Sequence, residues 1–120
     1  MSDTKQGMRM HYVLPFSVVV AALFTSFSVL GADDASFELT LKEHQFTPPV
    51  LTIPADKRVK LTIKNLDTTA AEFESKDFKA EKVIPAGGAV SLYIGQLKAG
   101  TYSFFDEFHA DQTKGTLVAK

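Results

Sequence analysis

Short segments of alternating apolar and polar residues, separated by turns that contain proline or glycine, constrain the fold of this chain most strongly. Val59–Ile63 alternates with period two after one such turn, and Val90–Ile94 follows another. Proline cannot donate to a β-ladder, so a proline-containing turn ends one strand before the next begins. The pattern predicts an all-β sandwich of about seven strands with Greek-key connections. The expected strands are Phe37–Leu41, Val50–Ile53, Val59–Ile63, Ala71–Glu74, Val90–Ile94, Thr101–Phe105 and Thr116–Ala119.

The N-terminal residues predict an export signal. Arg9 precedes an apolar run over residues 13–30, which is typical of a secretory signal peptide. Cleavage after Ala32 would divide the chain into a signal peptide, 1–32, and a single small domain, 33–120. The alternative is an uncleaved membrane anchor, because the apolar run is at the lower limit of what spans a bilayer. Both interpretations place the folded domain in the periplasm, and only the second attaches it to the membrane.

Composition excludes several classes of site. The chain contains no cysteine, which excludes disulfides, iron–sulfur clusters, thiolate zinc sites and a copper–thiolate bond. Its net charge is −1, and no basic cluster accompanies an aromatic platform, so nothing favours nucleic acid as a partner. The sequence also has no glycine-rich phosphate loop and no serine in a nucleophile motif, which argues against a hydrolase.

The segment Gly100–Lys120, which is expected to form a strand, a polar loop and a second strand, contains an unusual carboxylate. Tyr102, Phe104 and Asp106 share one face of the first strand, so Asp106 points toward the core if the two aromatic residues do. An unpaired carboxylate there would be costly, and it needs a metal ion, a histidine or backbone donors. The alternative is that Asp106 only caps the loop through nearby N–H groups.

His109 lies in the same loop as Asp106, three residues further along the chain. Glu107 and Asp111 flank it, so the loop concentrates carboxylate and imidazole donors, which are ligands for hard and borderline metal ions. By itself, His109 has an equally simple interpretation as a solvent-exposed loop histidine.

The same strand, loop and strand resemble the copper-binding loop of cupredoxins. The pattern Gly-x-Tyr-x-Phe at Gly100–Phe104 and the closing Gly-x-Leu-Val at Gly115–Val118 carry the resemblance. Cupredoxins place Cys, His and Met ligands in this loop. Asp106 stands at the cysteine position, His109 matches the histidine, and Lys114 stands where the methionine belongs. The resemblance implies a cupredoxin-like sandwich in which oxygen has replaced the sulfur ligands.

The resemblance also implies ligands from earlier in the chain. Asn65–Ser75 looks like the region that carries the first copper-binding histidine, with Glu72 at or beside that position. His44 precedes a segment that resembles the entrance to the second strand, near the same end of the sandwich. The alternatives are that Glu72 faces water and that His44 is an ordinary edge histidine. The predicted metal ligands are therefore Glu72, Asp106, His109, His44 and Glu107.

Four strings narrow the resemblance to small periplasmic cupredoxin-like proteins of bacterial ferrous-iron uptake. They are Glu72–Ser75, Glu81–Ile84, Ile94–Gly100 and Phe104–His109. This resemblance implies an exported protein that binds iron or Cu(II), has ferroxidase activity, and works with a membrane iron permease or a periplasmic iron-binding protein. Carboxylate and imidazole donors suit those ions and disfavour Cu(I). The alternatives are an envelope copper buffer or chaperone, and a structural or interaction module without a metal.

Overall fold

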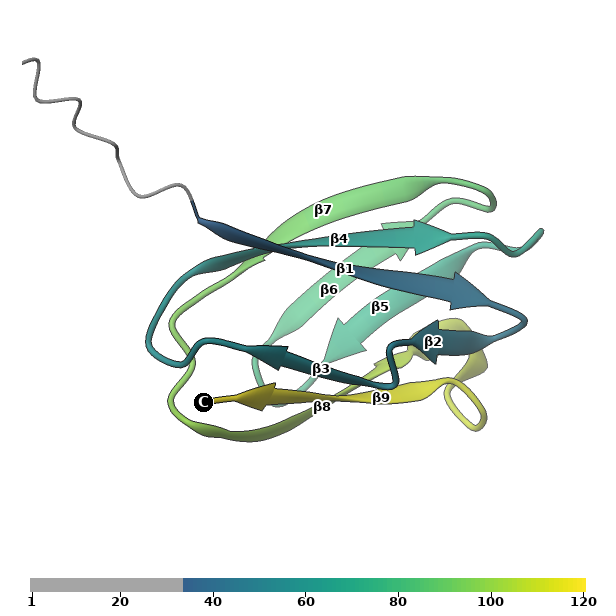
Figure 1. The fold of residues 1–120 in the computed structure, drawn as a ribbon. Coiled ribbons are helices and arrows are strands. Elements are labelled where there is room, and N and C mark those ends of the chain that lie inside the picture. The colour runs from purple at the N-terminus through teal and green to yellow at the C-terminus, as the bar shows by residue number, and fades with distance from the viewer. Residues whose placement is uncertain (1–33) are drawn as a thin grey trace, which may run out of the picture. The chain divides into compact units, whose positions relative to one another are not determined.

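The structure, a computed structural model, describes residues 34–120, which form two β-sheets (Figure 1). The first sheet has the strand order β2-β1-β4-β7 and comprises β1 Ala35–Lys42, β2 Gln45–Thr47, β4 Val59–Asn65 and β7 Ala89–Ile94. The second has the order β3-β9-β8-β5-β6 and comprises β3 Val50–Ile53, β5 Ala71–Ser75, β6 Ala80–Ile84, β8 Gly100–Asp106 and β9 Lys114–Ala119. The predicted signal peptide lies outside the described residues.

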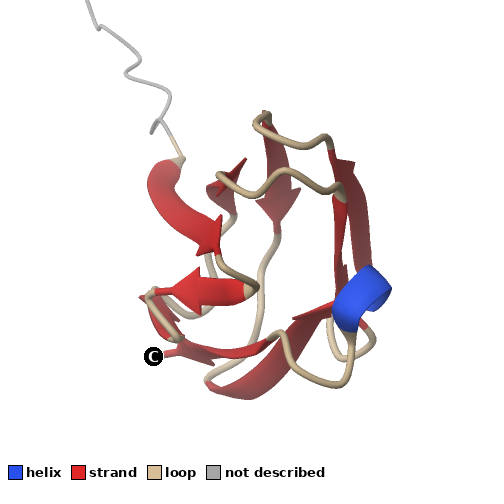
Figure 2. Ribbon diagram, turned by 90° about the vertical axis from the view of Figure 1, so that its right-hand side faces the viewer, coloured by secondary structure: helices blue, strands red, loops and turns tan. Residues whose placement is uncertain are grey.

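The strands surround a common interior, and one short helix, η1 Glu107–His109, lies beside them (Figure 2). β1 pairs with β4 and β3 pairs with β9 in parallel, while every other pairing within residues 34–120 is antiparallel. The predicted all-β sandwich is confirmed. No helix in this described part has the length and apolar character needed to cross a membrane.

The core follows from the alternation of the strands. Val59, Leu61 and Ile63 on β4 are at most 1% exposed, whereas the residues between them are partly exposed. Phe104 on β8 is fully buried and lies opposite Gly115 on β9. A Cβ atom at Gly115 would lie 2.3 Å from the Phe104 ring, so only glycine allows this close packing. Burial of each such large apolar side chain contributes about 1.5–3 kcal/mol.

The described residues form nine strands, and two of these were not expected from the sequence. β2 has only three residues and follows a tight turn directly after β1. β6 spans Ala80–Ile84, where the sequence indicated no strand. Its central residues are all exposed, so no apolar alternation marks it as a strand. The turn before it is organised by Asp77, whose Oδ2 accepts a hydrogen bond from the Ser103 N–H at 2.8 Å.

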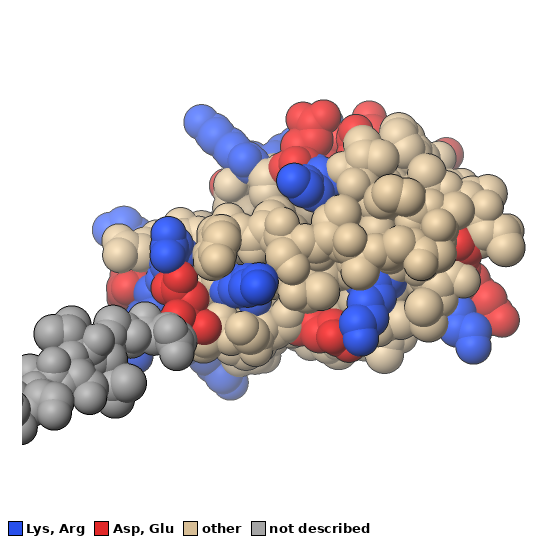
Figure 3. All heavy atoms as spheres, turned by 90° about the horizontal axis from the view of Figure 1, so that it is seen from above, with Lys and Arg blue, Asp and Glu red and all other residues tan. Residues whose placement is uncertain are grey.

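Charges of both signs are interspersed on the face seen from above, and neither sign forms a single patch there (Figure 3). The described residues include ion pairs between Arg58 and Asp34 at 2.6 Å and between Lys64 and Glu38 at 3.2 Å. Exposed pairs of this kind contribute little to stability. Three of the four buried polar residues within 34–120, Asn65, Asp106 and Thr113, lie at one end of the sandwich.

Three loops meet at that end, on the right-hand side of Figure 1. They are the turn between β1 and β2, the loop after β4 and the loop that contains η1. Hydrogen bonds join all three loops. We call this region the polar end and define it by Glu43, His44, Asn65, Asp67, Asp106, His109 and Thr113.

Candidate metal centre

Asp106 ends β8, and its side chain is fully buried at the polar end. Its Oδ1 atom accepts hydrogen bonds from the backbone N–H of Glu72 at 2.9 Å and of Phe108 at 3.0 Å. Its Oδ2 atom lies 2.7 Å from Nδ1 of His109. The side chain therefore caps η1 and also contacts the histidine, so the two roles that the sequence offered as alternatives occur together. Both carboxylate oxygens have protein partners.

His109 is held in one orientation by Asp106. An ionised carboxylate only accepts hydrogen bonds, so the hydrogen of the neutral imidazole sits on Nδ1 and the lone pair on Nε2. A carboxylate that contacts the far nitrogen of an imidazole is the usual arrangement around a metal-binding histidine. The side chain is 24% exposed, which leaves part of the ring accessible from solvent.

His44 lies against His109, although the two residues are far apart in the sequence. Their ring centroids are 4.3 Å apart, and the ring planes are tilted by 39°. The Nδ1 atom of His44 is 3.7 Å from Oδ2 of Asp67, and the side chain is 37% exposed. The polar end thus pairs two imidazoles, and each has a carboxylate near its Nδ1 atom.

Asp67 and Thr113 belong to the polar end, but the sequence did not indicate either of them. Asp67 accepts hydrogen bonds from the backbone N–H groups of Glu43 and His44. Thr113 is fully buried and donates its hydroxyl hydrogen to the His44 carbonyl at 2.8 Å. The one available signal for Asp67 was its position two residues after Asn65, because Asn and Asp near a strand end often form such turns.

The pKa of Asp67 is lower than that of an ordinary aspartate. Its partial burial acts in the opposite direction and is the largest single influence. The backbone N–H groups of His44 and Glu43, together with the imidazoles of His44 and His109, outweigh burial and stabilise the charged form.

Glu72 contributes its backbone, and not its carboxylate, to the polar end. Its N–H donates to Asp106, but its neighbours Ala71 and Phe73 face the core, so the Glu72 side chain lies on the outer face of the sheet. Its pKa is raised by partial burial and by the negative charges of Glu81, Glu107 and Asp106. This placement matches the alternative in which Glu72 is directed toward water.

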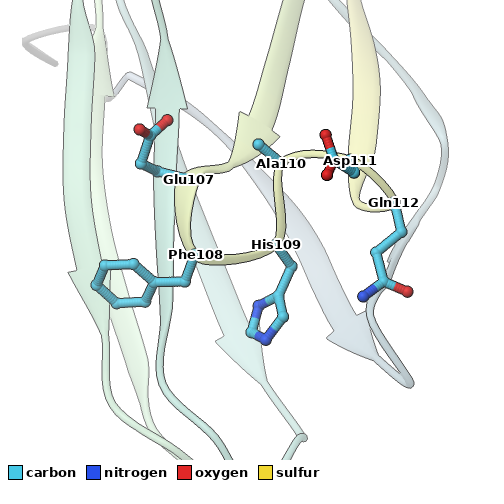
Figure 4. Close-up of a pocket in the computed structure, with 6 residues that line it drawn as sticks. All are labelled: Glu107, Phe108, His109, Ala110, Asp111 and Gln112. Carbon is cyan, nitrogen blue, oxygen red and sulfur yellow. The ribbon is translucent and has the colours of Figure 1, made fainter.

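Glu107 also points away from the imidazoles. Figure 4 shows the side chains of Glu107 and His109 leaving the loop in different directions. The loop borders an open hollow of about 380 Å³, which is lined by Glu107, Phe108, His109, Ala110, Asp111 and Gln112. Within residues 34–120, no three His, Asp or Glu side chains are gathered into a metal-binding group. The structure places Asp106 and His44 each against His109, and leaves the Glu72 and Glu107 carboxylates on the outer face.

A family model for the cupredoxin-like domain matches residues 15–119. The chain belongs to the cupredoxin-like domain family. A protein of Rickettsia prowazekii (strain Madrid E), named only as uncharacterized, is 33% identical over 81 residues, which are 68% of this chain and 65% of that protein. The cupredoxin-like chain thus spans less than two thirds of that relative's length.

Solved structures show the same fold. Auracyanin A, a "blue" copper protein from Chloroflexus aurantiacus, matches with a TM-score of 0.62 and 16% identity over 72% of this chain and 99% of that chain. Amicyanin from Paracoccus versutus matches with a TM-score of 0.55 and 17% identity over 74% of this chain and 83% of that chain. The predicted cupredoxin-like fold is confirmed.

A blue-copper centre does not fit this cupredoxin-like chain. Such a centre requires a cysteine thiolate, and the sequence has no cysteine. Asp106, which the sequence resemblance set at the cysteine position, already accepts hydrogen bonds from the protein with both of its oxygens. The imidazole nitrogens of His44 and His109 at the polar end suit Cu(II), zinc and iron.

Proposed function

We propose that this protein is an exported, metal-binding member of the cupredoxin-like family that binds Cu(II) or iron through His109 and His44. The observation that carries the proposal is the contact of two imidazoles, 4.3 Å apart, each with a carboxylate facing its Nδ1 atom. Asp106 fixes the tautomer of His109 and so leaves Nε2 as the coordinating atom. Solvent molecules or a second protein would complete the coordination.

The proposed site differs in chemistry from a blue-copper electron carrier. Without thiolate or thioether ligands it has no particular affinity for Cu(I). Imidazole donors bind Cu(II) more tightly than the other divalent first-row ions, so Cu(II) is the ion expected to bind most strongly in solution. A bound Cu(II) or Fe(III) ion would supply an electron acceptor, and the buried Asp106–His109 pair would hold its ligand in place.

Iron uptake is the process in which we place this site. The support is the resemblance of the Glu-Phe-Glu-Ser string at Glu72–Ser75 and the Glu-Phe-His string at Glu107–His109 to proteins of bacterial ferrous-iron uptake. The proposed partners are a membrane iron permease or a periplasmic iron-binding protein, and the proposed activity is oxidation of Fe(II) before transfer. The export signal predicted before Ala32 supports a periplasmic location.

Metal titration of single-residue variants tests the ligands. We expect the wild-type protein to bind one Cu(II) ion in calorimetry. We expect His109→Ala and His44→Ala each to weaken that binding by at least about tenfold, because each removes a nitrogen ligand. Glu81→Gln, an exposed acid on β6, is the matched control and should bind as the wild type does. Unchanged binding in both histidine variants would reject the proposed site.

The same titration tests Glu72 and Glu107, two of the three remaining predicted ligands. Glu72→Gln and Glu107→Gln should bind Cu(II) normally, because their carboxylates lie on the outer face. A loss comparable to that of His109→Ala in either variant would add that carboxylate to the ligand set. Anaerobic loading with Fe(II), followed by addition of oxygen and measurement of its consumption, separates iron oxidation from copper buffering, since a copper buffer consumes oxygen no faster than Fe(II) in protein-free buffer does.

A further inference from the structure

The turn that presents His44 has an unfavourable backbone conformation. Glu43 and His44 have φ angles of 51° and 58°, which lie in the left-handed region. Non-glycine residues are strained in this conformation, and glycine would adopt it without that strain. The chain nevertheless has a histidine at the second of these positions, so contacts with neighbouring residues must stabilise the turn.

Asp67 is the residue that holds the turn. Its two carboxylate oxygens accept the backbone N–H groups of both left-handed residues, with a distance of 2.9 Å to the N–H of His44. Asp67 is itself fixed, because its own N–H donates at 3.0 Å to the side chain of the fully buried Asn65. Its side chain is 13% exposed, so water competes little for these hydrogen bonds.

The carbonyl group of His44 is held from the opposite side. Thr113, from the loop that follows η1, donates its hydroxyl hydrogen to this carbonyl at 2.8 Å. The N–H and the carbonyl of His44 therefore have side-chain partners from two different loops. A histidine side chain that is 37% exposed would otherwise sample several rotamers, and this backbone clamp limits where the ring can lie relative to His109.

We propose that Asp67 is a positioning residue that sets the His44 imidazole beside His109 for metal binding. The inference rests on the proposed function, because it assigns Asp67 a role in that same site. Asp67 acts on His44 through the backbone N–H of His44 and through the Nδ1 atom of its ring, which lies 3.7 Å from Oδ2 of Asp67. The Nε2 atom of His44 is left free for the metal. Residues that orient a metal ligand in this way change metal affinity by about 10- to 100-fold when they are removed.

The experiment combines Cu(II) affinity with electron paramagnetic resonance, in which nitrogen hyperfine structure counts the coordinating imidazoles. We expect two nitrogens in the wild-type protein and one in His44→Ala. In Asp67→Ala we expect one nitrogen and an affinity about tenfold lower, although His44 is still present. The double variant should bind no more weakly than His44→Ala alone, because the two changes remove the same ligand.

Two control variants separate positioning from general loss of stability. Asp77→Ala removes a carboxylate that also accepts a backbone N–H group, from Ser103, and does not contact either histidine. It should lower the melting temperature but retain two coordinating nitrogens. Lys79→Gly relieves the same kind of left-handed conformation, at a φ of 54°, in the turn before β6 and outside the polar end, so it should raise the melting temperature and leave affinity unchanged. If Asp67→Ala does not fold, Asp67→Asn replaces it, because its amide oxygen still accepts one of the two N–H groups.

Two further outcomes would contradict the inference, and they are distinguishable. Two coordinating nitrogens and an affinity within twofold of wild type in Asp67→Ala would reject the positioning role and leave the proposed function intact. No nitrogen hyperfine structure in the wild-type protein would reject the proposed function itself, and the role of Asp67 with it.

Discussion

The two groups of carboxylates in this domain differ in what surrounds them. At the polar end, Asp67 and Asp106 each accept at least two backbone N–H groups and face an imidazole. On the outer face of the second sheet, Glu72 and Glu74 on β5 lie close to further acids from β6 and η1. We call this second region the acidic face and define it by Glu72, Glu74, Glu81 and Glu107.

The neighbouring groups decide whether each carboxylate favours its charged form. The pKa of Asp67 is lowered, because N–H donors and imidazoles compensate for its burial. The pKa of Glu74 is raised, first by partial burial and then by the charge of Glu107 and a hydrogen bond with it. Direct cross-strand pairing of Glu74 with Glu81 adds like-charge repulsion. A buried carboxylate can therefore stabilise this fold, whereas more exposed ones destabilise it.

The largest expected effect is that of removing Asp106. Asp106→Ala would leave two backbone N–H groups and the Nδ1 atom of His109 without their partner in a buried site. We expect a loss of about 3 kcal/mol in the free energy of unfolding, measured by urea denaturation. Asp106→Asn should lose less, because its amide oxygen still accepts the N–H groups. A loss below about 0.5 kcal/mol in Asp106→Ala would mean that the polar end is not held by this carboxylate.

A smaller, pH-dependent effect is expected at Asp67. Its lowered pKa means that its hydrogen bonds stabilise the fold above the ordinary aspartate pKa of 3.8 and are lost as pH falls through the lowered value. Asp67→Asn should therefore be less stable than wild type by about 2 kcal/mol at pH 7. The difference should shrink at the lowest pH at which both proteins remain folded. A difference that is constant from pH 7 to pH 3 would show that charge at Asp67 contributes nothing.

The sequence predicted the sandwich better than it predicted the site, for a physical reason. Alternation along a strand reports which residues face the core, and it placed Phe104 and Asp106 on the inner face, where both are fully buried. The family pattern pointed to a glutamate as a ligand, but strand parity turns the Glu72 side chain outward because Phe73 is buried. The alternation of inward and outward residues along this strand could be read from the sequence. It gave the alternative interpretation, in which Glu72 faces water.

Thr113 was beyond such reasoning, and the sequence offered only one local signal for Asp67, its position two residues after Asn65. Their importance depends on a turn from another part of the chain, whose left-handed residues, Glu43 and His44, carry no glycine signal. Hydrogen bonds between loops distant in sequence are set by the packing of the whole domain, and local patterns do not encode them. The strand β6 was missed for a related reason, since its exposed residues do not alternate.

The smallest effect is expected on the acidic face, and it has the opposite sign. Glu74→Gln removes one charge from a crowded group of acids, so it should raise the melting temperature slightly at pH 7. The raised pKa of Glu74 means that the folded protein binds its proton more readily than the unfolded chain does, so wild-type stability is penalised as pH rises through that value. The gain from Glu74→Gln should therefore disappear near pH 4, where the wild-type carboxyl group is largely protonated.

Glu38→Gln is the control, because Glu38 pairs with Lys64 and its replacement should give no gain. A melting temperature that falls in Glu74→Gln at pH 7 would show that this carboxylate is stabilised by its surroundings, as those at the polar end are.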